Sequence, residues 1–533
     1  MNLNLNFDIK TELSEFKKNI FISKKYWLIY LIFIGISTLS MLSIKNFENP
    51  KTEIIILFLV AIVGIICITY CYSKYSEKNL YKMAFLIIIV FGLLCAFLMP
   101  VLEPSDTHEH ITRAEMTSRG IIFPEYNGEN LSNHYFDGSK YVWTGEGFET
   151  IQSIKDLSDD RYSTARTLEH ATSKINYTII TVEQCAEQNP FYGYLPQAIG
   201  ILLAKLLNLD AIWLMWLARV FNLLCYATIV SYAVKKTPIF KVPIIAVACL
   251  PMSMFQAASV SIDSMIIGLC LFVIAYFFYL CESEGEIGYK DVGIFFGLTM
   301  LLGLLKLPYL AFSFLIFGIP FGKFKKKGMF FYLVIGIFVI GIIGIMWSNY
   351  ATDALWHSSR AVHYLKYNVS STLQMNFLLS DKLNPILLTS LILESLNGFI
   401  AGNFLIYPPD FSGGYTTASN FITAILPFFM GCVFLAYPFT EKFRFKSKLV
   451  ALLVLFIVYF GTVFIQFLTW SPSGQLVISG LSPRYFLPLL AIVPFVFGFN
   501  KVKEKDIEFD YYILTLTIAF MAVMPIAFVF GFY

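Results

Sequence analysis

The sequence has little charge: only 14% of its 533 residues are Asp, Glu, Lys or Arg, whereas 57% are hydrophobic. No soluble domain of this size needs so much apolar surface. Runs of about 18 to 22 apolar residues recur from Trp27 onward, and each is long enough to cross a bilayer core of about 30 Å as a helix. The composition therefore excludes an ordinary soluble protein and predicts an all-α, polytopic transmembrane helical bundle.

Cysteine and histidine are few and poorly spaced for a disulfide framework or a zinc site. Nearly all of the nine cysteines fall inside apolar runs, where they act as small hydrophobes, and Cys185 stands in a long polar loop. His108 and His110 could bind a divalent metal, but residues two apart on a helix point to different faces. We therefore assign no metal ligands and leave a divalent metal cofactor open.

A cleavable signal, internal repeats and a strong net charge are also missing. The first 25 residues lack the apolar core and small-residue cleavage site of a signal peptide, so we expect the span at Trp27 to be retained. The net charge is only +3, and the lysines cluster in short loops as the positive-inside rule explains. These features argue against nucleic acid as a partner and for the lipid bilayer.

Placing the lysine-rich connectors in the cytoplasm predicts about 13 spans. The predicted spans cover residues 27–46, 54–72, 83–101, 212–234, 242–258, 262–281, two short segments within 292–321, 330–348, 418–437, 449–469, 485–499 and 511–531. The stretch 192–207 is short and broken by Pro196 and Lys205, so we interpret it as a re-entrant or interfacial helix. Lys306 and Pro308 mark the outward turn inside 292–321.

This topology puts the N-terminus in the cytoplasm and two long loops, about 102–190 and 350–416, on the opposite face. All six histidines fall on that opposite face. We divide the chain into an N-terminal tail with two additional transmembrane helices, 1–82, and a membrane domain, 83–533.

The polar stretch that follows the third span is the first candidate active site. Asp106, Glu109, His110 and Arg113 recur at spacings of three and four, so a helix would set all four on one face. Ser105 is a plausible N-cap, and Gly120 a plausible helix end. We predict a short helix at the membrane surface; the alternative is a solvated linker helix.

Further ionisable residues lie within or at the ends of spans, where burial is costly and function is the default hypothesis. They are Arg219, Asp263, Lys306 and Arg484. Cations at that depth suit a phosphate with an adjacent lipid tail, and Asp106 is then a candidate general base for an acceptor hydroxyl, or the group that orients it. The alternative is that Arg219 and Asp263 are structural partners and that Lys306 and Arg484 reach toward headgroups; we favour structure for Arg219 and function for Arg484.

Several short motifs follow one another in order from residue 104 onward. They comprise Asp106, His110, Arg113 and Ala114; Tyr194, Pro196, Gln197, Ala198 and Gly200; Arg219 and Asn222; Pro251, Gln256, Ser259, Ser261 and Asp263; and Arg484, Tyr485 and Pro488. Together they resemble the bacterial membrane-protein family known as domain of unknown function 2142. That family is similar to the type-C glycosyltransferases, polytopic enzymes that take a sugar from a polyprenyl-phosphate carrier.

The resemblance implies a type-C-like fold over residues 83–533 in the bacterial cytoplasmic membrane, with the active site on the extracytoplasmic face. It implies transfer of a sugar from a polyprenyl-phosphate donor to a cell-envelope glycan or lipid-linked acceptor. We expect Asp106, Glu109 and His110 to be catalytic, and Arg113, Lys306 and Arg484 to bind the donor phosphate. The expected supporting residues are Tyr194, Gln197, Arg219, Asn222, Ser259, Asp263 and Tyr485.

The motifs also depart from the family pattern at one point. The family's acidic residue after the aspartate is Thr107 here, so a two-carboxylate mechanism would have to recruit Glu109 or another group. Two alternatives to the enzyme stay open: a transporter or flippase for lipid-linked glycans, and a non-catalytic assembly partner. The crowding of polar residues on one side and the lack of a repeat favour the enzyme over the transporter.

Overall fold

The computed structural model describes most of the chain. The described residues are 9–43, 50–101, 106–124, 144–150, 174–183, 186, 188–325, 328–356, 364, 366–380, 389–395, 420–437, 445–497 and 507–532. They are predominantly helical, with one short strand pair. The predicted N-cap Ser105, five of the six histidine side chains and most of the predicted loop 350–416 lie outside this described part.

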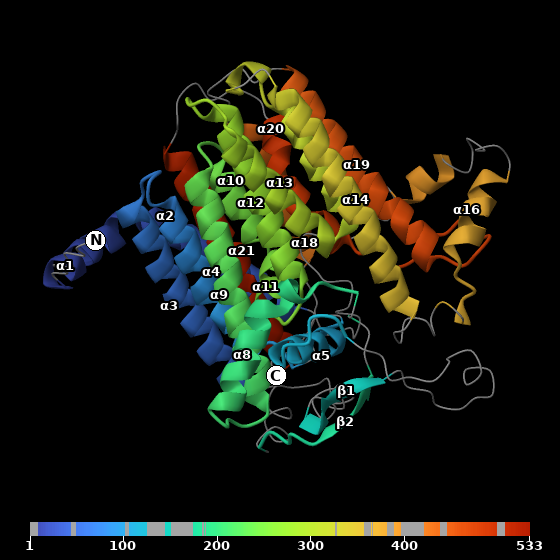
Figure 1. Cartoon of the computed structure of the whole chain (residues 1–533). Coiled ribbons are helices and arrows are strands. Elements are labelled where there is room, and N and C mark those ends of the chain that lie inside the picture. The colour runs from blue at the N-terminus through green and yellow to red at the C-terminus, as the bar shows by residue number, and fades with distance from the viewer. Residues whose placement is uncertain are drawn as a thin grey trace.

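Eight helices of the described part are long and apolar enough to cross a membrane, and they pack into one bundle (Figure 1). They are α2 (Lys24–Leu42), α3 (Pro50–Lys74), α4 (Leu80–Leu98), α9 (Ile212–Lys236), α12 (Asp263–Glu282), α14 (Met329–Trp356), α19 (Phe445–Trp470) and α21 (Ile507–Phe532). Large apolar side chains such as Phe58 and Phe338 are exposed on the outside of the bundle, as lipid contact requires. The chain is therefore an integral membrane protein with an all-α bundle.

Shorter elements complete the bundle and its edges. They are α1 (Ile9–Ile22), α10 (Lys241–Ala248), α11 (Pro251–Ala257), α13 (Tyr289–Leu305), η4 (Leu307–Gly318), η5 (Phe321–Lys323), α16 (Ser371–Leu379), α18 (Asn420–Ala436), η6 (Pro483–Ile492) and α20 (Val493–Phe497). Where the sequence predicts one span over 242–258, the chain forms α10 and α11 instead. Pro251 begins α11, because its ring disfavours helical geometry in the preceding residue and suits a first helical turn.

The predicted interruption at Lys306 is present as a break between two helical segments. Residue 306 is extended, with φ −154° and ψ 105°, so α13 ends there and the 3₁₀ segment η4 begins one residue later. Pro308 cannot donate a backbone hydrogen bond, which favours a helix start at this position. The break brings the Lys306 side chain to the end of two short apolar segments.

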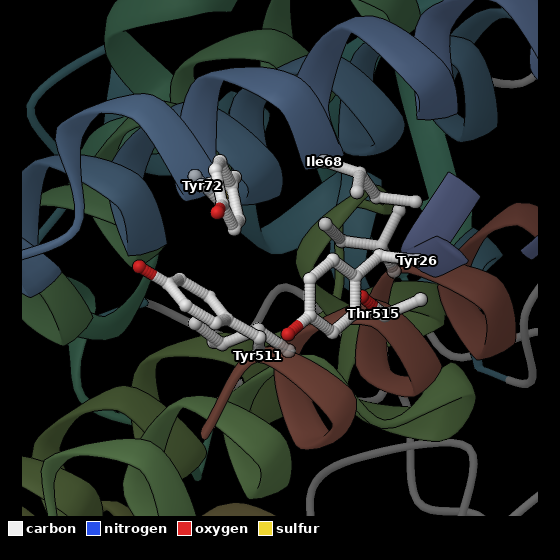
Figure 2. Close-up of a pocket in the computed structure, with 8 residues that line it drawn as sticks. Tyr26, Ile68, Tyr72, Tyr511 and Thr515 are labelled. Atoms are coloured by element: carbon white, nitrogen blue, oxygen red, sulfur yellow. The ribbon is translucent and has the colours of Figure 1, made fainter. Parts of the chain in front are cut away.

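The helices α2 and α3, near the N-terminus, pack against α21, near the C-terminus, so segments far apart in the sequence lie side by side. Figure 1 shows the three helices within the bundle. Gly64 of α3 gives room for the Tyr30 ring, since an added Cβ would lie 2.0 Å from a ring atom. The Tyr30 hydroxyl donates a 2.7 Å hydrogen bond to the Val60 carbonyl. Aromatic side chains from all three helices surround a small hollow between them; Figure 2 shows Tyr26, Ile68, Tyr72, Tyr511 and Thr515.

One end of the bundle carries the elements that follow α4 (Figure 1). These are α5 (Thr107–Ser118), the strands β1 (Thr144–Phe148) and β2 (Ile179–Glu183), the 3₁₀ turn η3 (Phe191–Tyr194) and α8 (Leu195–Leu206). The strands pair antiparallel with Thr144 opposite Glu183. At 12 residues α8 is too short to cross a bilayer, and its exposed stripe of Leu195, Ile199, Leu202 and Leu206 is apolar.

Candidate functional site

Arg219 fixes the chain where α4 ends and the polar segment begins. This side chain of α9 is fully buried, and its guanidinium donates hydrogen bonds to four backbone carbonyls, those of Ala96, Met99, Pro100 and Val101. Ala96 lies in the last turn of α4, whose carbonyls lack partners within the helix, and the other three carbonyls directly follow the helix. A buried charge needs many partners, so the guanidinium and these carbonyls satisfy one another. Arg219 therefore positions the exit from α4, in keeping with the structural role that the sequence favours.

A buried polar network positions Asp263 at the start of α12. Gln197 Nε2 donates to Asn222 Oδ1 at 3.0 Å, and Asn222 Nδ2 donates to the Ser259 carbonyl at 2.7 Å. The Ser259 hydroxyl accepts from the Ser261 amide, and the Ser261 hydroxyl accepts from the Asp263 amide. These bonds hold the turn between α11 and α12, so Gln197, Asn222 and Ser259 belong to one network that reaches Asp263.

Asp106, Asp263, Lys306 and Arg484, which we call the charge centre, meet at one place although they come from four distant parts of the chain. Arg484 Nη2 lies 3.0 Å from Asp106 Oδ2, and Arg484 Nε lies 2.8 Å from Asp263 Oδ2. Lys306 Nζ lies over the Tyr485 ring and interacts electrostatically with Asp263 and Arg484. The centre thus contains two anions and two cations.

Asp106 has an uncommon backbone conformation. Its φ of 60° and ψ of 12° are left-handed, and it occupies the N-cap position of α5, for which the sequence predicted Ser105. Aspartate is one of the few non-glycine residues that adopt this conformation, and it does so at a cost of about 1–3 kcal/mol. The helix ends at Ser118, and Gly120 follows with φ 83°, as the sequence predicted.

His110 is buried against Tyr194 and Asn189. His110 Nδ1 is 2.6 Å from the Tyr194 hydroxyl, which accepts a 2.9 Å hydrogen bond from Asn189 Nδ2. The hydroxyl and Nδ1 share one hydrogen bond, and the tautomer of the histidine sets which of the two atoms donates. Burial lowers the pKa of His110, and the nearby Asp106 only partly opposes this shift, so the neutral ring is favoured.

The other two predicted residues of α5 are placed differently. Glu109 is partly buried and interacts electrostatically with His110 and Tyr194. Arg113 is 1% exposed, and its guanidinium donates to the backbone carbonyls of Asn189, Ile121 and Ile122 at 2.9–3.4 Å. These carbonyls use the Arg113 donors and tie α5 to the segment before η3, and the phosphate-binding role of Arg113 stays a prediction.

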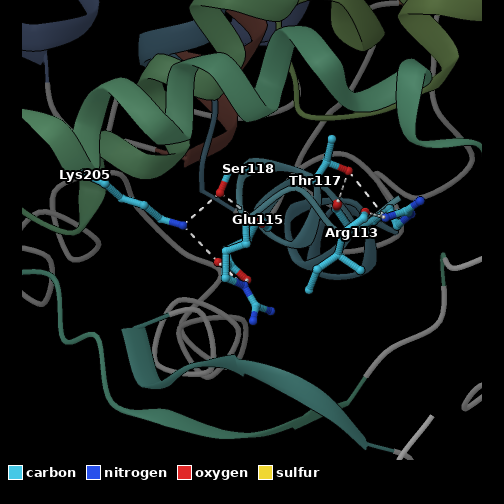
Figure 3. A network of polar contacts seen from close by, with 7 residues as sticks. Arg113, Glu115, Thr117, Ser118 and Lys205 are labelled. Atoms are coloured by element: carbon cyan, nitrogen blue, oxygen red, sulfur yellow. Dashed lines mark hydrogen bonds and ion pairs between the residues drawn. The ribbon is translucent and has the colours of Figure 1, made fainter. Parts of the chain in front are cut away.

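A buried ion-pair cluster between α5 and α8 was missed by the sequence analysis (Figure 3). Glu115, whose side chain is fully buried, accepts from Lys205 Nζ at 2.9 Å and from Arg119 Nε at 2.9 Å. Lys205 also donates to the Ser118 hydroxyl at 2.8 Å. The signals were a Glu–Arg pair at helical spacing and a lysine inside an apolar stretch.

A cavity of about 170 Å³ lies beside the charge centre. Its polar lining includes Lys306 together with Gln188, Asn189 and Gln466, and its apolar lining includes Trp347 of α14. Lys306 belongs to both the cavity and the charge centre, and Asn189 joins the cavity to Tyr194. Gln466, a polar residue inside a span, could have been noticed by the same criterion that selected Arg219.

The described side chains provide no group of three His, Cys, Asp or Glu residues that could hold a metal ion. The predicted pair of His108 and His110 is described only in part, since the His108 side chain lies outside the described part, as do His134, His170, His357 and His363. A divalent metal at His108 and His110 therefore stays open, as the sequence left it.

The comparisons with known proteins agree with the membrane fold. A family model described as "Predicted membrane protein (DUF2142)" matches residues 89–493, about three quarters of the chain. The match begins within α4 and leaves α2, α3 and α21 outside. No curated protein and no solved structure matches the chain. The match covers most of the bundle and every residue of the charge centre, and the chain therefore belongs to the DUF2142 family of membrane proteins.

Proposed function

We propose that this protein is a membrane glycosyltransferase that takes a sugar from a polyprenyl-phosphate donor and transfers it to a cell-envelope glycan or lipid-linked acceptor. The observation that carries the proposal is the charge centre at the edge of a partly apolar cavity. A donor of this kind needs cations for its phosphate, an adjacent space for its sugar and an acid or base for the acceptor hydroxyl.

The donor phosphate binds to Lys306 and Arg484. The two carboxylates and two cations of the charge centre sum to zero formal charge, so an incoming phosphate is not repelled by a net negative site. Arg484 is held by the buried Asp263 and by Asp106, whose side chain is 36% exposed. A phosphate oxygen can therefore replace the more exposed Asp106 carboxylate on Arg484 while Asp263 keeps the guanidinium in place.

Asp106 then acts as the base. The acceptor oxygen bonds to the anomeric carbon as the bond from that carbon to the phosphate oxygen breaks. Asp106 takes the acceptor proton, and the electron pair leaves on the lipid phosphate, whose growing negative charge Lys306 and Arg484 stabilise. Glu109, on the same helix, is the carboxylate available where the family's second acid is replaced by Thr107.

The remaining site residues act by positioning. His110 and Tyr194 connect α5 to the wall of the cavity through Asn189. Arg113 ties α5 to the residues just before η3, and Arg219 and Asn222 hold the two chain segments that carry Asp106 and Asp263. We also propose that the site faces the extracytoplasmic side. Lysine-rich connectors such as 235–241 lie at the opposite end of the bundle, and the positive-inside rule predicts that such connectors are cytoplasmic.

The proposal is tested with purified full-length protein and a panel of polyprenyl-phosphate sugars. Transfer to a lipid-linked or glycan acceptor is measured by mass spectrometry. Asp106→Asn should reduce transfer by about 10²-fold or more, because it removes the base while keeping the size of the side chain. Asp353→Asn, at an exposed position near the end of α14, is the matched control.

Two results would count against the proposal. Full activity of Asp106→Asn would remove Asp106 from the mechanism. Movement of intact lipid-linked glycans across proteoliposomes, without transfer of the sugar, would favour the transporter.

A further inference from the structure

The cavity beside Lys306 is built from four separate parts of the chain. Gln188 and Asn189 precede η3, Lys306 and Pro308 come from the break between α13 and η4, and α14 and α19 complete the wall. Its volume of about 170 Å³ is many times the roughly 10–15 Å³ that one water molecule needs. The cavity therefore has room for a ring-sized group such as a sugar.

Two carbonyl oxygens of cavity-lining side chains have unmet hydrogen-bonding capacity. The Oε1 atoms of Gln188 and Gln466 are buried and accept no hydrogen bond in the described part of the protein. Buried polar atoms are nearly always paired, and an exception calls for a partner. Both residues line the cavity, and a change of amide orientation would be needed before either oxygen accepts from a hydroxyl group there.

The remaining lining suits a neutral, hydroxyl-rich ring. Trp347 supplies a large aromatic side chain for the apolar C–H face of a sugar, and Leu304, Leu305 and Leu307 add apolar surface. The described lining residues include no carboxylate, so they offer no charged partner for the ammonium of an amino sugar. Lys306 is the cation of the lining and marks the end at which a phosphate binds.

We infer that this cavity is the binding site for the sugar of the donor, and that it takes a single neutral sugar, with Gln188, Gln466 and Trp347 as its specificity-determining residues. This inference rests on the proposed function, because the phosphate at Lys306 orients the sugar into the cavity. It goes further by assigning the class of sugar and the residues that recognise it.

The test is equilibrium binding to the purified full-length protein. The probes are neryl phosphate and its glucosyl, galactosyl, mannosyl and N-acetylglucosaminyl derivatives. At least one sugar derivative should bind about tenfold more tightly than neryl phosphate, which corresponds to one or two well-made hydrogen bonds. Gln466→Leu and Trp347→Leu should each reduce that preference about fivefold or more and leave the Kd for neryl phosphate unchanged.

Gln475→Leu is the matched control, because Gln475 is exposed and lies outside the cavity lining. Thermal unfolding of each variant in detergent checks that the fold is kept. If neryl phosphate binds but no derivative binds better, or if the preference survives both substitutions, the sugar site is refuted while the phosphate site stands. If neryl phosphate itself does not bind, the sugar site and the proposed function both fail.

Discussion

The two carboxylates that flank Arg484 should be coupled to it with very different strengths. Both form short ion pairs, 3.0 Å for Asp106 and 2.8 Å for Asp263, but their side chains are 36% and 13% exposed. Charges about 4 Å apart interact by roughly 4 kcal/mol at an effective dielectric constant of about 20, and solvent screening reduces an exposed pair to about 1 kcal/mol or less. After partial desolvation is subtracted, we expect a coupling of about 2–3 kcal/mol for Arg484 with Asp263 and below about 1 kcal/mol for Arg484 with Asp106.

This difference can be measured with two double-mutant cycles. One combines Arg484→Met with Asp263→Asn, and the other combines Arg484→Met with Asp106→Asn. The free energy of unfolding is followed by SDS titration in mixed micelles. Arg484→Met alone should destabilise the protein by about 3–5 kcal/mol, because Asp263 loses its ion-pair partner. Asp263→Asn in the same chain should recover part of the loss.

The result bears directly on the mechanism. A weak Asp106 coupling means that this carboxylate can leave Arg484 for an acceptor hydroxyl at little cost, while Asp263 retains the guanidinium. Equal couplings, or a stronger coupling to Asp106, would refute the assignment of Asp106 as the exchangeable partner.

Three further predictions concern the elements that support the site. Arg219→Leu should lower the free energy of unfolding by about 4 kcal/mol, measured by the same titration, because four carbonyls lose their donor; a loss below about 1 kcal/mol would contradict this role. Burial lowers the pKa of His110, so the unfolded chain takes up a proton at this residue before the folded protein does as the pH falls below about 6.5. The free energy of unfolding should then decrease by up to about 1.4 kcal/mol per pH unit. His110→Gln should flatten that pH dependence. Glu115→Leu should lower the free energy of unfolding by about 3 kcal/mol, because it leaves the partly buried Lys205 without its carboxylate. The double variant with Lys205→Met should be more stable than Glu115→Leu alone. Additive losses from the two substitutions would contradict the buried ion pair.

The sequence predicted helices and helix breaks correctly where neighbouring residues alone set the backbone conformation. The spacing of Asp106, Glu109, His110 and Arg113 predicted a helix, and the structure has one from Thr107 to Ser118. The Lys306–Pro308 interruption predicted two segments in place of one span, and α13 and η4 are those segments. In each case the covalent geometry of neighbouring residues is sufficient to explain the outcome.

The partners of the charged residues could not be predicted in this way. Arg113 is on the same helix as His110, yet it binds backbone carbonyls, whereas Arg484 reaches Asp106 from 378 positions away. Lys205 looked like an interruption of an apolar stretch and proved to be half of a buried ion pair. Such pairings depend on which helices pack together, and the spacing of residues along one helix carries no information about its neighbour.

By itself, the sequence determined that this is a helical membrane protein. It also singled out one short polar segment and several cations as candidate site residues. It could do so because a bilayer core accepts long apolar helices and makes buried charges costly wherever they occur. Only the tertiary structure decided that Arg484 joins Asp106 to Asp263, that Arg219 serves the end of α4, and that Gln188, Trp347 and Gln466 share one cavity with Lys306. These are contacts between distant segments, and they exist only once the helices have packed.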